Sequence, residues 1–298
     1  MGAMSFNLFA MVTTRGSAEY TPYALESFFS CTALAHDDLF ILIDNDHSFS
    51  VDLLRAYPRV ELKQNVEPLS FAANVNQMIE YARAKNATVF FLNNDLIFTP
   101  RWIEPLLVSE RAILSPLSNR ELQVGEGSFV LKNSMALAEY LPYKEELRKI
   151  GQRLQASPRR ENRLLIYPFY CIKLPAAVYS ELGLLDDGFG SGGGEDTDYC
   201  LRAALHDIPL KAVASSFVLH FNGCSTWKVE TREQEQVRIA KFRLRFEERW
   251  GSLLLRLGIG YDMSVLAEAG VSEMAQQGRF REVVLALAAR AGIDVRCY

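Results

Sequence analysis

The sequence has few cysteines, and none of them lie in a paired motif. The five thiols are scattered through 298 residues without C-x-x-C spacing, at Cys31, Cys171, Cys200, Cys224 and Cys297. An odd number of isolated cysteines is typical of reduced thiols in a cytoplasmic protein. We therefore expect reduced thiols, most of them in the core.

Long apolar runs and an excess of basic charge are also missing. No segment approaches the roughly 20 apolar residues of a membrane-spanning helix, and the N-terminus lacks the basic flank and apolar core of a signal peptide. The net charge of −4 argues against nucleic acid as the main partner. With 49% hydrophobic and 23% charged residues, the composition is that of a globular protein of one large domain or slightly more.

Three familiar motifs do not explain the chain. The P-loop pattern G-x-x-x-x-G-K-[ST] and the nucleophile elbow G-x-S-x-G do not occur. Residues 188–193 fit G-x-G-x-x-G, but a dinucleotide fingerprint must follow a buried strand, and the preceding residues 181–187 do not have a strand pattern. We therefore reject a dinucleotide site here.

The first hundred residues alternate short apolar runs with helical patterns. Strands are predicted over 6–12, 39–43, 60–63 and 88–92, and helices over 20–34, 51–56 and 71–84. Near-continuous apolar strands separated by helices predict an α/β fold with a mostly parallel, Rossmann-like sheet flanked by helices.

The later pattern is weaker and ends in a helical extension. It predicts a helix over 101–108, strands over 164–174, 210–214 and 217–221, and helices over 175–182 and 227–250. We expect a main domain over 1–254 and a helical tail over 255–298, with two further helices in residues 261–298. Residues 278–289 resemble half of a helical repeat; alternatively, the tail leads into a further C-terminal domain.

Polar side chains follow three of the predicted strands. Thr13, Asp44 and Asp95 each lie where a strand ends, and ligands of parallel sheets bind at that edge. Two acid-amide motifs, 44–46 and 93–95, compete as hard-cation sites that carboxylates and substrate phosphates complete. Turns that use Asn and Asp are the other explanation for both.

The stretch after residue 188 combines glycines with acids. Gly192, Gly193 and Gly194 run directly into Glu195 and Asp196, which begin an amphipathic helical pattern. Glycine lets a large ligand approach the backbone, and acids at a helix start are stabilised in the ionised state. The pattern predicts either a general base presented to a bulky substrate or a plain turn with an acidic helix start.

Two further features of the sequence each have two explanations. His220 ends an apolar strand, as a core histidine or as a member of a polar site. Residues 144–163 carry seven basic residues against three acids, which suits either a rim for a phosphate-bearing acceptor or a solvated helix and loop.

The ordered set of motifs resembles a known family. Phe71–Asn76, Phe90–Asp95, Thr99–Trp102, Gly194–Arg202 and His220 occur in the order seen in inverting family-two glycosyltransferases of the GT-A fold. The resemblance covers roughly residues 6–226, and its middle part is most similar to the rhamnosyltransferase-like branch.

The resemblance implies roles for individual residues on the donor side. Asp44 matches the acid that contacts the donor nucleotide, and the same pocket is lined by Thr13, Arg15, Asn76 and Asn94.

Roles on the reaction side follow in the same way. Asp95 matches the last acid of the D-x-D-type motif that holds metal and diphosphate, and His220 completes that metal site. Asp196 matches the catalytic base, with Glu195 beside it, and Gly193 and Gly194 border the acceptor and sugar pocket. Two positions depart from the family pattern: Ser70 replaces a common glycine, and Asn93 replaces the first D-x-D acid.

The resemblance thus implies a metal-dependent enzyme that transfers a sugar, with inversion, from a nucleotide diphosphate sugar to a saccharide or lipid-linked saccharide. Mn²⁺ or Mg²⁺ is its cofactor. A cytoplasmic location, at the inner face of a membrane where the acceptor is lipid-linked, and a part in bacterial polysaccharide synthesis are expected. The alternative is a non-catalytic carbohydrate-binding or scaffold module on the same fold. A nucleotidyltransferase would need a Gly- and basic-rich loop after the first strand, which the chain lacks.

Overall fold

The computed structural model describes residues 6–108, 111–123, 125–126, 129–222, 224, 230–295 and 298, so Cys297 and the predicted helix start at 227 lie outside the described residues. The strands are β1 (Asn7–Thr13), β2 (Leu39–Asp44), β3 (Val60–Gln64), β4 (Thr88–Asn93), β5 (Leu96–Phe98), β6 (Ile113–Leu117), β7 (Gly125–Glu126), β8 (Phe129–Val130), β9 (Glu161–Leu164), β10 (Cys171–Leu174) and β11 (Leu210–His220).

The α-helices are α1 (Thr21–Cys31), α2 (Phe71–Arg83), α3 (Leu137–Tyr140), α4 (Lys144–Gln155), α5 (Ala176–Leu182), α6 (Glu195–Leu205), α7 (Arg232–Trp250), α8 (Ser252–Gly258), α9 (Ser264–Glu268), α10 (Ser272–Gln276) and α11 (Phe280–Arg290). Short 3₁₀ helices are η1 (Val51–Ala56), η2 (Glu104–Leu106), η3 (Leu141–Tyr143) and η4 (Asp187–Phe189). In the described part of the chain, no helix has the length and apolar character needed to cross a membrane.

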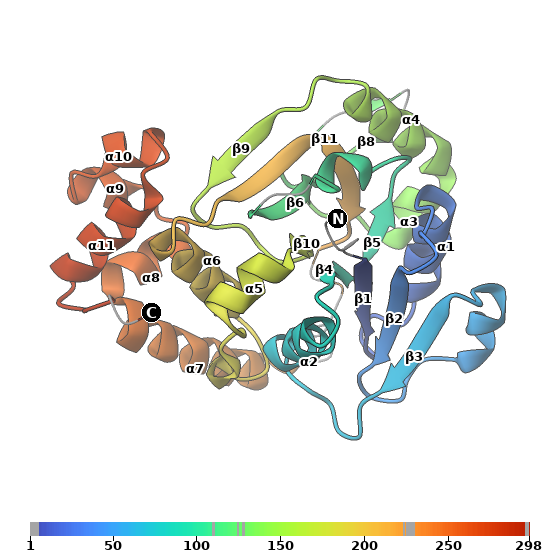
Figure 1. Ribbon diagram of the computed structural model, residues 1–298, viewed down its shortest axis with the longest axis horizontal. Helices are drawn as coiled ribbons and strands as arrows, with labels where there is room; N and C mark the ends of the chain where they lie inside the picture. Colours follow the sequence, from blue (N-terminus) through green and yellow to red (C-terminus); the bar gives the residue numbers. More distant parts are fainter. Residues whose placement is uncertain are drawn as a thin grey trace.

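The first half of the chain forms the parallel part of the sheet, in the order β3-β2-β1-β4. From β1 the chain continues outward to β2 and β3, and it then returns to the other side of β1 as β4. Because these two crossovers run in opposite directions and are right-handed, α1 and α2 lie on opposite faces of the sheet (Figure 1). Thr13 pairs with Asp44, and Val12 pairs with Asn93. The register thus brings three predicted strand ends to one edge of the sheet, and the α/β prediction is confirmed.

The second half of the sheet is mixed. β10 is antiparallel to both of its neighbours, β4 and β6, whereas β11 runs parallel to β6. β5 and β9 both pair antiparallel with β11. The run of parallel strands predicted from the first hundred residues is therefore confirmed for β1 to β4 and does not continue beyond them.

Two predicted elements in the middle of the chain are wrong. The helix predicted over 101–108 is only the turn η2, because Arg101 is left-handed (φ 61°) and Pro105 lacks the N–H that a helix needs. The single strand predicted over 164–174 is two strands, β9 and β10. Pro168 lies between them and cannot donate to a ladder.

Two later predictions also change. The strands predicted over 210–214 and 217–221 form one strand, β11, whose register shifts between Val213 and Phe217. The tail after 260 holds three helices instead of two, with breaks at Gly270 and Gly278, which have φ of 64° and 70°. Helix α8 spans the predicted domain boundary at 254/255, and that division stays a prediction.

The tail packs on the outer face of α6. Leu201 and Leu205 of α6 share one apolar cluster with Phe246 and Trp250 of α7 and with residues of α8 to α11. The remaining clusters lie along the sheet, where Val75, Met78 and Ile79 of α2 are fully buried as the helical periodicity predicts. Helix α6 therefore lies between the sheet and the tail (Figure 1).

A buried carboxylate joins α6 to α7. Asp198 has no exposed surface, and one of its oxygens accepts the Trp250 indole N–H at 2.9 Å and pairs with Arg249 at 2.8 Å. Its other oxygen pairs with Arg202 at 2.9 Å. Arg202 in turn donates to the carbonyls of Leu182 and Leu184. The first turn of α6 is thus attached to α7 and to the end of α5.

Replacing Asp198 by Ala removes one carboxylate from two guanidinium groups and an indole N–H. We expect the free energy of unfolding to fall by about 3–5 kcal/mol, because breaking a buried ion pair leaves uncompensated charge. Urea unfolding followed by circular dichroism measures the loss. The matched control is Asp207→Ala, which removes the exposed pair to Arg281 and should cost less than about 1 kcal/mol. Equal losses in the two variants would contradict this account of α6.

Candidate active site

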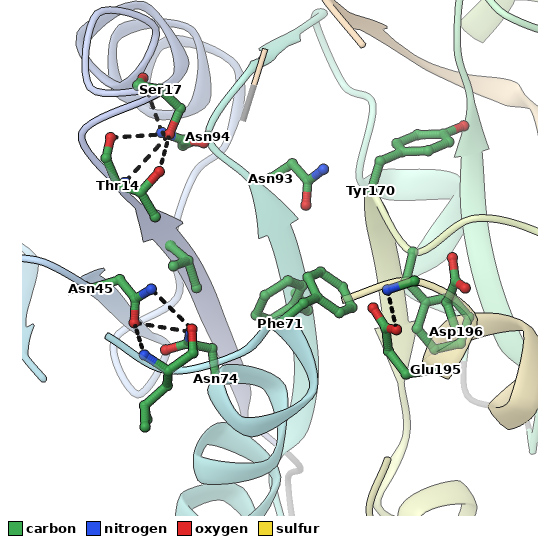
Figure 2. Close-up of a pocket in the computed structure, with 15 residues that line it drawn as sticks. Thr14, Ser17, Asn45, Phe71, Asn74, Asn93, Asn94, Tyr170, Glu195 and Asp196 are labelled. Atoms are coloured by element: carbon green, nitrogen blue, oxygen red, sulfur yellow. Dashed lines mark hydrogen bonds between the residues drawn. The ribbon is translucent and has the colours of Figure 1, made fainter. Parts of the chain in front are cut away.

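A cavity of about 220 Å³ lies at the edge of the sheet where β1, β2 and β4 end. Figure 2 shows its lining: Thr14, Ser17 and the amides of Asn45 and Asn74 lie on one side, and Glu195 and Asp196 lie on the other. Phe71, Phe169 and Tyr170 are among the aromatic side chains that also line it. The first turn of α6 therefore faces the strand ends across an enclosed space.

Asp44 lies beneath the cavity instead of lining it. Its carboxylate is fully buried and accepts the N–H groups of Ser48 and Phe49 and the amide of Gln64. The next residue, Asn45, lines the cavity. In this structure Asp44 therefore shapes the loop that follows β2.

A second cavity of about 380 Å³ adjoins the first and shares Thr14, Asn45 and Leu69 with it. Arg15 and Asp46 lie on its wall, where the Arg15 N–H donates to the Asp46 carboxylate at 2.9 Å. Arg15 thus lines a cavity, and its predicted contact with a donor nucleotide remains a prediction. Thr13 is buried and shares its hydroxyl hydrogen bond with Thr21, at 2.8 Å.

An amide network that we did not predict connects the two cavities. The Asn45 side-chain oxygen accepts from Asn65 at 2.7 Å, from the Leu69 N–H at 2.9 Å and from Asn74 at 3.1 Å. Asn74 also accepts from Asn65 and Gln77. These bonds hold the loop before α2 against the end of β2. The sequence signal for this network was four amide side chains within residues 65–77. Asn45, which accepts from two of them, lies at least 20 residues earlier in the chain.

Asn76 and Asn94 point away from the cavity centre. The Asn76 side chain bonds both the N–H and the carbonyl of Leu185 at 2.8 Å, which attaches α2 to the loop after α5. Asn94 donates to the hydroxyls of Ser17 and Thr21 and so holds the loop after β1 (Figure 2). Asn94 still borders the cavity, whereas Asn76 does not. Their predicted contacts with a donor remain predictions.

Asp95 and His220 lie side by side, and their metal-binding role remains a prediction. The His220 Nε2 lies 3.3 Å from a carboxylate oxygen of Asp95, which is fully buried. Within the described residues neither Asp95 oxygen accepts a hydrogen bond. Tyr170, which lines the cavity, stacks on the His220 ring with centroids 4.9 Å apart.

A buried carboxylate with free oxygens beside an imidazole fits a divalent cation such as Mn²⁺. In the described chain there is no group of three or more His, Cys, Asp or Glu side chains that could hold a metal. Asp95 and His220 would therefore supply two ligands, and substrate oxygens or water would supply the rest.

Glu195 and Asp196 begin α6 immediately after the glycine collar, residues 189–194. Gly194 at the helix N-cap is left-handed (φ 89°), and the Gly193 N–H donates to the Glu195 carboxylate at 2.6 Å. Asp196 accepts the Thr197 N–H at 2.7 Å. Glu195 is only 4% exposed, whereas Asp196 is partly exposed toward the cavity.

Desolvation controls the protonation of this pair. Burial, together with the adjacent charge of Asp196, raises the pKa of Glu195 to about 8. Burial also raises the pKa of Asp196, although hydrogen bonds from the N–H groups of Thr197 and Phe169 oppose the shift. Two carboxylates this close do not ionise together easily. Near neutral pH, Glu195 therefore holds a proton.

The collar has a packing reason for its glycines. At Gly193 (φ 120°) a Cβ would lie 2.6 Å from the Phe242 ring of α7, and at Gly194 it would lie 3.2 Å from Phe189. The predicted acceptor role of Gly193 remains a prediction, and Gly193 does line the cavity.

Residues 10–108, which carry β1 to η2 and the strand-end side of the cavity, match the family described as glycosyl transferase family 2. The match covers about a third of the chain. No curated protein matches the sequence significantly. The matched region holds Thr13, Arg15, Asp44, Asn94 and Asp95, whereas Glu195, Asp196 and His220 lie beyond it.

Two solved structures share the fold. A structure of GalNAc-T7 with UDP, GalNAc and Mn²⁺ has a TM-score of 0.57 and 13% identity, over 95% of this chain and 55% of that one. A mannosyltransferase from Pyrobaculum calidifontis in complex with GDP-Man and Mn²⁺ has a TM-score of 0.52 and 10% identity, over 99% and 89%. This chain thus spans just over half of the first structure. The GT-A fold is confirmed, while the rhamnosyltransferase-like branch stays a prediction.

The raised pKa of Glu195 predicts a pH-dependent stability. An acid with a higher pKa in the folded protein binds its proton more tightly when folded. The free energy of unfolding should then fall as the pH rises from 4.5 toward about 8, by at most about 1.4 kcal/mol per pH unit for one proton. Glu195→Gln should flatten this dependence, measured by urea unfolding at several pH values. Glu248→Gln, an exposed acid of α7, should keep the wild-type slope. Parallel curves for all three proteins would contradict the assignment.

Proposed function

We propose that this protein transfers a sugar from a nucleotide diphosphate sugar to a hydroxyl group of a saccharide or lipid-linked saccharide, with inversion at the anomeric carbon. One observation carries the proposal. Across one cavity, the desolvated carboxylates of Glu195 and Asp196 face the strand ends of the region that matches family two. The buried carboxylate of Asp95 and the imidazole of His220 lie beside that cavity.

Asp196 is the general base in this proposal. Transfer requires an ionised acceptor for the proton of the attacking hydroxyl. Glu195 is buried, bound to the Gly193 N–H and protonated near neutral pH. Asp196 has cavity exposure and N–H donors that favour its ionised form. A proton held on Glu195 also removes a competing negative charge beside Asp196.

The strand-end side receives the donor. The cavity bordered by Arg15 and Asp46 suits the nucleoside, because these two residues give one wall polar groups and because the cavity shares Thr14 and Asn45 with the central cavity. When bound at Asp95 and His220, Mn²⁺ or Mg²⁺ supplies Lewis-acid stabilisation of the leaving diphosphate. The sugar then lies between that side and Asp196, so a single displacement by the acceptor inverts the anomeric carbon.

Asp196→Asn preserves the volume of the side chain and removes the carboxylate that acts as the general base. We expect the variant to bind nucleotide with the wild-type affinity and to lose transfer by about 10²–10⁴-fold. A panel of nucleotide sugars that includes UDP-GalNAc and GDP-Man is first screened by thermal shift with Mn²⁺, since a bound donor stabilises by mass action. Release of nucleoside diphosphate then measures turnover. Near-normal turnover in Asp196→Asn would remove Asp196 as the base. A wild-type protein that binds saccharides but turns over no donor would favour the binding-module alternative.

Asp95→Asn should separate metal binding from folding. We expect Mn²⁺ to raise the affinity of the wild type for UDP or GDP by tenfold or more, and this gain to vanish in Asp95→Asn because a neutral amide binds divalent cations poorly. Isothermal titration calorimetry with and without Mn²⁺ measures the gain. Asp187→Asn, at an exposed acid of η4, is the control and should retain the full effect. An equal Mn²⁺ gain in all three proteins argues against a metal at Asp95.

A further inference from the structure

Tyr170 is linked to both halves of the candidate metal pair, Asp95 and His220. Its ring stacks on the His220 imidazole, with the ring centroids 4.9 Å apart and the two planes inclined by 28°. Its carbonyl accepts the N–H of Asn93, two residues before Asp95, at 2.8 Å. Tyr170 immediately precedes β10 and is only 2% exposed. One buried residue thus joins the end of β4 to the end of β11.

Strand pairing holds the backbone of the metal pair. His220 pairs with Leu96, the residue after Asp95, and the Phe221 N–H donates to the Asp95 carbonyl at 3.0 Å. The His220 N–H donates at 2.8 Å to the side-chain oxygen of Asn119, which is fully buried. These bonds fix where the two side chains begin. They do not fix the rotation of the imidazole about its side-chain bonds.

The imidazole itself has few hydrogen-bonding partners. Its Nε2 lies 3.3 Å from the Asp95 carboxylate. Among the residues that the structure describes, none bonds its Nδ1. Histidines that bind metals usually donate their second ring N–H to a carboxylate, a carbonyl or water, and that bond sets the orientation of the ring. Since no described residue makes such a bond to His220, the stacked ring of Tyr170 is the main restraint on its orientation.

The Tyr170 ring is held in turn by hydrogen bonds at its far end. Its hydroxyl donates to the Pro116 carbonyl of β6 at 2.8 Å and lies 2.6 Å from the Tyr167 hydroxyl. Figure 2 shows the ring at the edge of the cavity, with this hydroxyl directed away from Glu195 and Asp196. The ring therefore cannot turn away from the imidazole without breaking buried hydrogen bonds, which is costly.

We propose that Tyr170 is a positioning residue for the metal site, and that its ring holds the His220 imidazole with Nε2 directed at the cation bound by Asp95. This inference rests on the proposed function, because it requires a divalent cation at Asp95 and His220. The described residues provide no cluster of three or more metal-binding side chains. A loosely held imidazole would therefore cost the cation one of its two protein ligands.

Three variants of Tyr170 separate its ring from its hydroxyl. Tyr170→Leu and Tyr170→Met remove the ring, and the flexible Met fills more of the vacated space if the Leu variant is too unstable to measure. Tyr170→Phe keeps the ring and removes only the hydroxyl. The matched control is Tyr179→Leu. Tyr179 of α5 is 1% exposed, its hydroxyl donates to the Ala87 carbonyl at 2.7 Å, and it does not line the cavity.

Isothermal titration calorimetry measures how much Mn²⁺ raises the affinity of each protein for UDP or GDP, and urea unfolding measures its stability. We expect the Mn²⁺ gain to fall by about tenfold in Tyr170→Leu and Tyr170→Met, because residues that orient metal ligands typically contribute that much affinity. Tyr170→Phe and Tyr179→Leu should lose stability and keep the gain. The affinity without Mn²⁺ should be equal in all the proteins, which separates a metal effect from direct contact between Tyr170 and the nucleotide.

NMR of the metal-free protein tests the stacking itself. The chain has four histidines, and comparison with His220→Asn identifies the signals of His220. Its ring protons should lie upfield, because they are close to the face of the Tyr170 ring. Tyr170→Leu should shift the His220 signals and leave those of His36, His47 and His206 in place, whereas Tyr170→Phe should leave all four sets unchanged.

An equal Mn²⁺ gain in the wild type and in the ring-less variants would overturn the positioning role. So would a loss of the gain in Tyr179→Leu as large as that in Tyr170→Leu, since the gain would then follow stability alone. A similar loss in Tyr170→Phe would assign the effect to the hydroxyl and overturn the role of the ring. Failure of the proposed metal site is a separate result. In that case the wild type itself shows no Mn²⁺ gain, while the NMR shifts still show whether Tyr170 orients the His220 ring.

Discussion

The position of the candidate acids depends on the buried carboxylate of Asp198. Its bonds to Trp250, Arg249 and Arg202 attach the first turn of α6 to α7 and, through Arg202, to the end of α5. A carboxylate without water must have such partners, because an isolated buried charge costs far more than its surroundings can offset. The geometry that satisfies Asp198 also fixes where Glu195 and Asp196 meet the cavity, two or three residues earlier on the same helix.

Packing and acid chemistry are coupled at the glycine collar. The Phe242 ring lies so close to Gly193 that a Cβ there would be only 2.6 Å from it, and a Cβ at Gly194 would lie 3.2 Å from Phe189. The next residue, Glu195, is buried, and its burial together with the charge of Asp196 raises its pKa to about 8. In the proposed reaction, a proton held on Glu195 leaves the role of the base to Asp196.

Local patterns predicted most of the first half of the chain. The apolar runs of β1, β2 and β4 and the periodic face of α2 lie where the sequence places them, because each pattern is set by neighbours a few residues away. Prediction was weaker where tertiary contacts or single residues override the pattern. Pro168 divides one apolar run into β9 and β10, and Arg101 and Pro105 prevent a helix. The site residues that share a strand end, such as Thr13 and Asp44, were grouped correctly, whereas the amide network of Asn45, Asn65 and Asn74 was not foreseen.

By itself the sequence determined the α/β class, the strand-end polar residues and the acidic start of α6, since these follow from periodicity and from residues adjacent in the chain. Only the tertiary structure decided which of those side chains face a cavity. Asp44 and Asn76 turn to backbone groups of other loops, while Asp95 meets His220 across β5 and β11. Only the packing of α7 on the collar explains why residue 193 is a glycine. The reason is physical: burial and desolvation depend on segments far apart in sequence, and no local pattern encodes which of them meet.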